Sequence, residues 1–243
     1  FGDAGGVAAH VAAPWLLPIA LATLVAGTLG VLASRDLGRM LAYFVVASIG
    51  TLLAAVGLFN LAGLYAALFY LMHTTLVTAG MFLLADAIRI QRGVLVYQSE
   101  GPVSQPLLLG SLFFLGTMAL AGMPPLSGFL GKVMILGAAA ENPAAAWVWS
   151  IVLGSGLLSL IALGRAGSIL FWKTAEAPSA KGSLATALPM TALLTSSILL
   201  VAAGQPISDF ASATAQQLMA AGSYVEGVLG SAYMDAFHSQ VRG

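Results

Sequence analysis

Stretches of apolar residues long enough to cross a lipid bilayer recur along almost the whole chain. A membrane-spanning helix needs roughly 20 such residues, and this sequence has 59% hydrophobic but only 7% charged residues. A water-soluble domain has about 25% charged residues, so this chain cannot cover an ordinary surface facing water. The apolar runs are rich in Leu, Ala and Gly without strict alternation, which favours helices over a closed barrel. The sequence therefore predicts an all-α integral membrane protein.

Six membrane spans are predicted, and the fourth is too long for one straight helix. The spans cover residues 14–34, 40–58, 62–88, 106–140, 145–172 and 184–203. At about 1.5 Å per residue, the fourth would extend roughly 50 Å. Prolines remove backbone donors and clash with the preceding turn, and glycines allow unusual backbone angles. We therefore expect two half-helices around an unwound stretch at 123–127, with the break set by Gly122, Pro124, Pro125 and Gly128.

The basic residues predict how the spans are oriented. If each span crosses once, seven of the nine Lys and Arg residues fall on one side of the membrane: Arg35, Arg39, Arg89, Arg92, Arg165, Lys173 and Lys181. Only Arg242 falls on the other side, and Lys132 lies inside the membrane. Loops on the cytoplasmic side are enriched in Lys and Arg, so the side with seven is predicted to be cytoplasmic. Both ends of this segment are then extracytoplasmic.

The composition changes after Pro206, which divides the chain into two predicted parts. Residues 1–205 form the helical bundle, and residues 206–243 form an amphipathic extracytoplasmic tail that contains Asp209, Glu226, Asp235 and His238. The first residue is Phe1 rather than Met, and the apolar pattern begins almost at once. We therefore expect the chain to be part of a longer protein.

Lys132 is the strongest candidate for a functional residue. It lies nine residues before Glu141, where the fourth span leaves the bilayer, so its backbone is roughly 13 Å from that edge. A lysine at the centre of a membrane helix costs about 2.5 to 3.5 kcal/mol, and such residues mark ion or proton pathways. The preceding helix break supports this interpretation, because discontinuous helices form ion sites in transporters. The alternative is a lysine that pairs with a carboxylate of another chain for assembly.

His73 is the second deep ionisable group, near the middle of the third span. Histidine titrates near neutral pH and can relay protons, although a buried histidine can equally be a hydrogen-bonded core residue. Hydroxyl groups accompany it and are candidates for lining a hydrated path. This set comprises Thr74, Thr75, Thr78, Ser48, Tyr43 and Ser127. Glu141 is a candidate exit residue, with an interfacial helix end as the alternative.

Other site classes find no support in the sequence. The chain has no cysteine, no metal, nucleotide or phosphate motif, and no basic block suited to nucleic acid. We therefore expect no metal, no cofactor and no catalytic residues.

Three segments resemble the antiporter-like membrane subunits of Mrp-type cation/proton antiporters and of respiratory complex I. Residues 35–43, RDLGRMLAY, resemble the D-L-x-R-x-L-A-Y segment of that family. Residues 71–75, LMHTT, followed by MFLL at 81–84, are similar to its central histidine helix. Residues 122–132, GMPPLSGFLGK, are close to its G-x-P-P-x-S-G-F-x-G-K signature. Within the family, the chain is most similar to the D subunit of the Mrp antiporters.

This resemblance implies a fold and a function. The chain would be the C-terminal six of about fourteen spans, in the bacterial plasma membrane, with Lys132 and His73 handling protons in exchange for Na⁺ or K⁺. Its partners would be the other subunits and the bilayer. One departure is Val77, where many relatives have a second lysine.

Two alternative functions remain open from the sequence. The first is a proton-pumping subunit of a redox complex of the complex I or membrane hydrogenase type. The second is a structural membrane subunit without an ion path of its own. In each case the chain is expected to be a transporter component or a scaffold rather than an enzyme.

Overall fold

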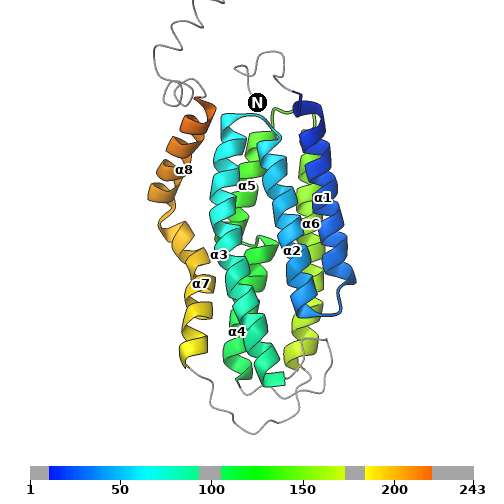
Figure 1. Cartoon of the computed structure of the whole chain (residues 1–243), viewed down its shortest axis with the longest axis vertical. Coiled ribbons are helices and arrows are strands. Elements are labelled where there is room, and N and C mark those ends of the chain that lie inside the picture. Colours follow the sequence, from blue (N-terminus) through cyan, green and yellow to red (C-terminus); the bar gives the residue numbers. More distant parts are fainter. Residues whose placement is uncertain (1–10, 93–104, 173–183, 221–243) are drawn as a thin grey trace, which may run out of the picture.

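The computed structural model describes residues 11–92, 105–172 and 184–220, and every regular element in these ranges is a helix (Figure 1). The helices lie side by side in an elongated bundle. They are α1 (Ala13–Ala33), α2 (Leu37–Val56), α3 (Leu61–Arg92), α4 (Pro106–Ala121), α5 (Ser127–Ala139), α6 (Ala145–Gly167) with a π-helical end (Ser168–Trp172), α7 (Leu184–Ala202) and α8 (Gly204–Met219). The predicted all-α membrane fold is confirmed.

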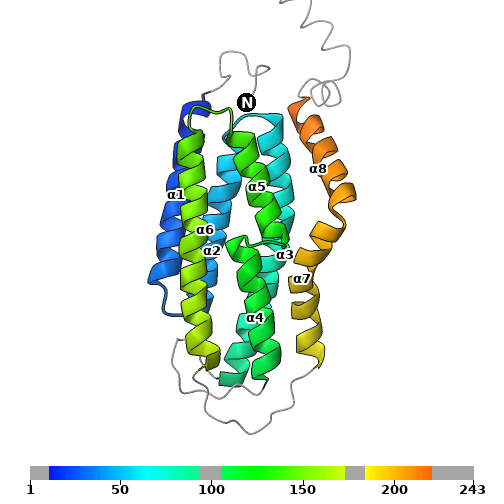
Figure 2. The same ribbon diagram turned by 180° about the vertical axis from the view of Figure 1, so that it is seen from behind.

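The helices agree with the predicted spans. Among the described residues, α1, α2, α3 and α6 are each long and apolar enough to cross a membrane, whereas α4 and α5 are shorter apolar helices. In Figures 1 and 2, α5 continues the path of α4 through the bundle, and α8 continues that of α7. The fourth predicted span is therefore discontinuous. The structure adds a feature that the sequence did not predict: α7 and α8 form a pair bent by 83°.

Helix α8 is packed along the bundle beside α3. Tyr65 on α3 donates a 2.8 Å hydrogen bond from its hydroxyl to Ser208 Oγ, and Ala211 and Ala215 are fully buried. The described part of the predicted tail is thus joined to the bundle by a side-chain contact. Its extracytoplasmic location stays a prediction, and Glu226, Asp235 and His238 lie outside the described residues.

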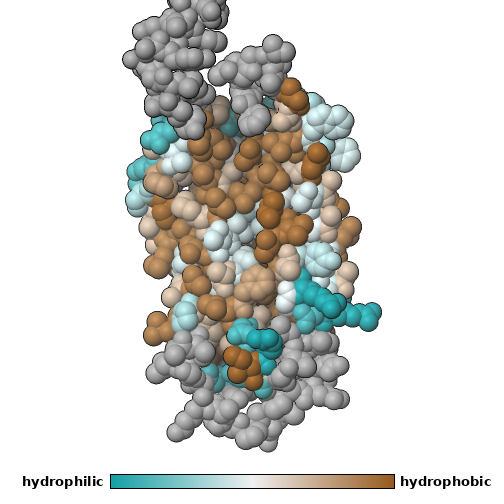
Figure 3. Space-filling view, viewed as in Figure 1, coloured by the Kyte–Doolittle hydropathy of each residue, from teal (hydrophilic) through white to brown (hydrophobic). Residues whose placement is uncertain are grey.

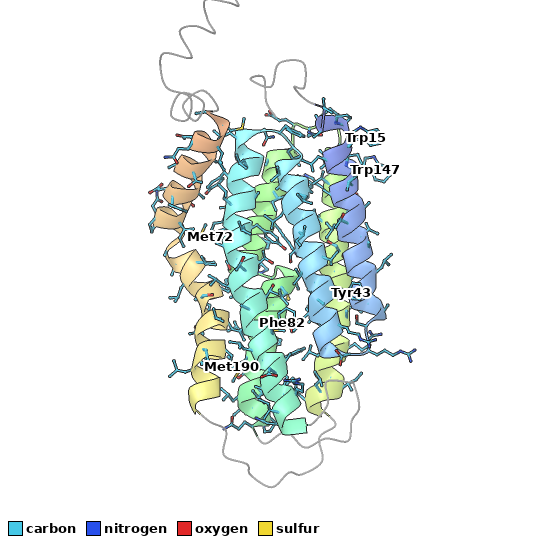
Figure 4. All side chains as sticks on the ribbon, viewed as in Figure 1. Trp15, Tyr43, Met72, Phe82, Trp147 and Met190 are labelled. Atoms are coloured by element: carbon cyan, nitrogen blue, oxygen red, sulfur yellow. The ribbon has the colours of Figure 1, made fainter. Side chains whose placement is uncertain are left out.

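The side of the bundle is largely hydrophobic, as a lipid-facing surface requires. Figure 3 shows brown surface over most of its length, with hydrophilic patches near the ends. Trp15 and Trp147 lie close to each other at the end where α1 begins, and both are exposed (Figure 4). Tryptophan is enriched at the boundary between membrane and water, so these residues mark one predicted boundary.

The first family-like segment begins helix α2. Asp36 is its N-cap, and Asp36 Oδ1 accepts a 2.9 Å hydrogen bond from the backbone N–H of Arg39. Beside it, Arg165 on α6 donates to the backbone oxygens of Leu32 (2.8 Å) and Ser34 (3.4 Å). A cation is stabilised by the free carbonyls at a helix C-terminus. Arg165 thus reaches the connection between α1 and α2. This agrees with its predicted position at the same end of the bundle as Arg35 and Arg39.

Glycines allow α1 and α2 to pack at close range, which gives a first testable prediction. A Cβ on Gly50 would collide with the backbone of Leu24. We therefore expect Gly50→Leu to force the two helices apart and to destabilise the protein by about 1 to 3 kcal/mol. Thermal unfolding of the purified protein in detergent measures this. Gly154→Leu on α6 is the control, because a Cβ there meets nothing within 4 Å; equal losses in both variants would contradict the prediction.

Candidate functional site

The candidate site is built around the interruption between α4 and α5. Helix α4 ends at Gly122, whose φ of 80° is left-handed and suits glycine. The backbone N–H groups of Gly122 and Met123 both donate to the oxygen of Met118, at 3.1 and 2.9 Å. Pro124 and Pro125 have no N–H to continue the helix, and α5 begins at Ser127. The unwound residues are thus 122–126, one residue earlier than predicted.

Lys132 bridges the two half-helices. From α5, its Nζ donates a 2.7 Å hydrogen bond to the oxygen of Ala121, the last residue of α4. The ammonium group therefore lies at the C-terminal end of α4, where the helix dipole favours a positive charge. Lys132 pairs with no carboxylate among the described residues. The break and the lysine, predicted from separate features of the sequence, form one site.

Two glycines leave room for this lysine. A Cβ on Gly122 would lie 3.0 Å from Lys132 Nζ, and a Cβ on Gly156 of α6 would lie 3.4 Å from it. The lysine also lines a cavity of about 220 Å³ between α5 and α6. Phe129 and Leu157, which line the same cavity, are exposed on the surface of the bundle. Lys132 itself is partly buried, and its cavity borders the surface of the bundle.

His73, on α3, packs against the N-terminal end of α5, the second half-helix. Its ring is almost fully buried, and Nδ1 is 2.7 Å from Ser127 Oγ. The ring also interacts with the backbone oxygen of Ala119 in α4, and it is close enough to Lys132 for their charges to interact. Ser127 Oγ is in turn 2.8 Å from Ser197 Oγ on α7. The break thus brings Lys132, His73 and Ser127 together, and it adds Ser197, which was not conspicuous in the sequence.

Tyr70 is a second residue that was not predicted from the sequence. It is buried one turn before His73, with the two ring centroids 5.6 Å apart. Its hydroxyl lies near those of Ser48 and Thr51 on α2. A polar band therefore crosses the bundle from α2 through Tyr70 and His73 to α5. The spacing of three residues between Tyr70 and His73 puts both on one helix face, and this signal was available in the sequence.

The predicted path-lining hydroxyls lie in three places, one of which is the break, where Ser127 contacts His73. Ser48, Thr74, Thr75 and Thr78 line one cavity of about 230 Å³ between α2 and α3. Thr78 Oγ1 is buried without a hydrogen-bond partner, and a buried hydroxyl beside a cavity is a place where water binds. Tyr43 is elsewhere: it packs against Gly30 of α1 and is partly exposed (Figure 4).

Glu141 and Val77 also have clear positions. Glu141 is exposed in the connection between α5 and α6, away from the break. Val77, where the family resemblance leads one to expect a lysine, is fully buried in an apolar cluster with Met81 and Leu84. Position 77 is therefore apolar in this chain. The deep ionisable groups, Lys132 and His73, lie at the break. The described residues include no cluster of three His, Asp or Glu side chains suited to a metal.

Several helices that are long and apolar enough to cross a membrane, with a polar site at a helix break among them, define a multi-pass membrane protein. Residues 5–161 match the model of the family described as NADH:quinone oxidoreductase/Mrp antiporter, transmembrane. The chain belongs to this family.

Similar proteins agree with that assignment. The D subunit of a probable K⁺/H⁺ antiporter of Rhizobium meliloti (strain 1021) is 32% identical, over 94% of this chain and 48% of the relative. The D subunit of a Na⁺/H⁺ antiporter of Alkalihalophilus pseudofirmus is 30% identical, over 88% of this chain and 44% of the relative. The structure of the Mrp complex from Dietzia sp. DQ12-45-1b contains a chain with the same fold, with a TM-score of 0.79 and 24% identity, over 90% of this chain and 50% of that one. The chain spans about half the length of the curated relatives it matches.

Proposed function

We propose that this chain is part of the D subunit of a multisubunit cation/proton antiporter and that it moves protons in exchange for Na⁺ or K⁺. The observation that supports this most strongly is the ammonium group of Lys132 on the oxygen of Ala121 at a helix break. Lysine can release and regain a proton. In a continuous helix the oxygen of Ala121 would accept a backbone N–H, whereas at the break it accepts from Lys132. The names of the relatives, D subunits of K⁺/H⁺ and Na⁺/H⁺ antiporters, point to the same activity.

In this proposal, the proton passes between Lys132 and His73 across the break. The hydroxyls of Ser48, Thr74, Thr75 and Thr78 hold water in the cavity beside α3, and Tyr70 connects that cavity to His73. Ser127 contacts the histidine ring, and Glu141 is the proposed exit. Tyr43 has no place in this path, because it packs on α1.

The orientation is part of the proposal. The end of the bundle with Arg35, Arg39, Arg89 and Arg165 faces the cytoplasm of a bacterial cell, by the excess of basic residues there. The start of α1 and the end of α8 are both at the opposite end of the bundle, on different sides of it (Figure 1), and we place this end outside the plasma membrane. Its partners are the other subunits of the antiporter and the surrounding lipid.

The exchange itself can be measured with the full-length protein in its complex. In everted vesicles acidified by respiration, addition of Na⁺ or K⁺ is expected to raise the internal pH, and the more effective cation identifies the substrate. Vesicles that contain the assembled complex but respond to neither cation would contradict the proposal. Flavin and iron–sulfur subunits in the purified complex would favour a redox-driven pump instead, which the family description also includes.

His73 gives a second test of the path. Glutamine can keep a hydrogen bond to Ser127 but cannot titrate, so His73→Gln is expected to slow exchange roughly 10- to 100-fold with normal assembly. The control is Thr23→Val on α1, because Thr23 donates to the oxygen of Ile19 in its own helix and lies outside the proposed path, so we expect no more than a small change there. Normal exchange in His73→Gln would remove histidine from the path.

A further inference from the structure

Three buried side chains from three helices form a continuous chain of hydrogen bonds at the break. His73 on α3, Ser127 on α5 and Ser197 on α7 are exposed by 2%, 0% and 0%. Ser127 Oγ is the middle member, 2.7 Å from His73 Nδ1 and 2.8 Å from Ser197 Oγ. Ser197 lies outside the three motif segments at 35–43, 71–84 and 122–132, so its role is argued from these contacts.

The direction of these bonds follows from the number of protons. A serine hydroxyl has one proton to donate, so Ser127 can donate to only one of its two partners. In helix α7, a serine commonly donates to the carbonyl four residues earlier, which for Ser197 is Leu193. The oxygen of Leu193 already accepts a hydrogen bond from the Ser196 hydroxyl. Among the described residues, the hydroxyl of Ser197 makes no hydrogen bond other than the one with Ser127, so its proton can point at Ser127, and that of Ser127 at the histidine.

The other ring nitrogen faces a carbonyl. A Cβ on Gly128 would meet both His73 Nε2, at 2.9 Å, and the oxygen of Ala119, so both atoms border the same small space. A carbonyl oxygen can only accept, so the nitrogen beside it is the one that needs a proton.

We propose that Ser197 is a positioning residue that fixes the tautomer of His73: Ser197 donates to Ser127, Ser127 donates to Nδ1, and the neutral ring has its proton on Nε2, facing Ala119. Nδ1 then has no proton and accepts a hydrogen bond from Ser127. If Nδ1 becomes protonated, both hydroxyls must turn, so that Ser127 accepts from Nδ1 and Ser197 accepts from Ser127. This row of hydrogen bonds ends on α7, six residues before Ala203, where the bend into α8 begins. The last turns of α7 are thereby held to the break.

The test reads the ring itself and uses the full-length protein in its complex, labelled with ¹⁵N-histidine. Whatever other histidines the complex contains, the difference between wild type and His73→Gln identifies the signals of His73. In wild type we expect a bare Nδ1 and a protonated Nε2. In Ser197→Ala we expect the signals of both tautomers, and in Ser197→Thr, which keeps the hydroxyl, the wild-type pattern. Ser196→Ala is the matched control, because within the described part of the chain Ser196 bonds only to its own helix, through Leu193.

Two outcomes would overturn this inference: a protonated Nδ1 in the neutral wild-type ring, or a Ser197→Ala spectrum identical to that of wild type. Its consequence for transport rests on the proposed function, and there Ser197→Ala is expected to slow exchange about fivefold, the effect of one hydrogen bond. If His73→Gln leaves exchange normal while Ser197→Ala still mixes the tautomers, the proposed path fails and the positioning role stands.

Discussion

Replacing Lys132 with methionine is expected to stop cation/proton exchange while making the protein more stable. Methionine fills a similar volume beside Gly122 and Gly156 but has no proton to transfer. Removing the deep charge also removes an insertion cost of about 2.5 to 3.5 kcal/mol. Exchange in vesicles should therefore fall at least about 100-fold, while the amount of assembled complex and its unfolding temperature stay the same or rise. A folding defect would instead lower exchange, complex and unfolding temperature together.

Arginine at this position separates a fixed charge from a mobile proton. Lys132→Arg keeps a positive donor near Ala121 but cannot be deprotonated in a protein. If Lys132 only held the half-helices together, Lys132→Arg would retain exchange, and a purely structural subunit would also tolerate Lys132→Met. We expect exchange to be lost in both variants once the amount of complex is matched. Normal exchange in Lys132→Met would contradict the proposed function.

The break and its lysine could be predicted because each depends on a residue type with strong local consequences. Pro124 and Pro125 are two successive residues without an N–H, which together prevent a helix from continuing, and Gly122 adopts the left-handed conformation that closes α4. Lys132 is conspicuous because a charge at that depth is costly in any arrangement. The sequence thus predicted where both features lie along the fourth span. It could not show that the lysine reaches back eleven residues to Ala121.

The polar band was harder to predict because it depends on how the helices face each other. Serine and tyrosine are common in membrane helices, where they also serve packing, so neither Ser197 nor Tyr70 was conspicuous in its own span. Ser197 contacts Ser127, which is 70 positions away in the sequence. Tyr70 lies near hydroxyls of another helix. Tyr43 is the opposite case. Its polar side chain in span two suggested that it lines a hydrated path, but in the structure its ring packs against Gly30 of α1.

The bend between α7 and α8 has the same explanation. Gly204 and Pro206 were present in the sequence, but they lay at the predicted edge of a span and indicated its end. In the structure, α8 continues along α3, and Tyr65 bonds to Ser208. The bend therefore depends on a partner surface more than on the local sequence. Its consequence is that α7 ends close to the first break, where Ile198 and Ala202 line a cavity together with Pro125.

Gly128 is the residue on which this whole arrangement depends most, and Gly128→Ala is expected to disrupt it. A Cβ there would collide with the oxygen of Ala119 and lie 2.9 Å from His73 Nε2. Backbone cannot move aside as a flexible side chain can, so α5 must shift away from α4. That shift pulls Ser127 from His73 and Lys132 from Ala121. We expect exchange to fall roughly 100-fold and stability to drop by about 1 to 3 kcal/mol.

The matched control is Gly137→Ala in the same helix, where a Cβ meets nothing within 4 Å. Alanine favours a helix over glycine by roughly 0.5 to 1 kcal/mol, so this variant should be slightly more stable than wild type and exchange normally. Thermal unfolding and vesicle exchange, measured on both variants in the assembled complex, give the comparison. If Gly128→Ala exchanged cations as well as Gly137→Ala, the contact between the half-helices would not be what positions Lys132 and His73. Because both substitutions add one methyl group to α5, a difference between them can come only from what that methyl group meets.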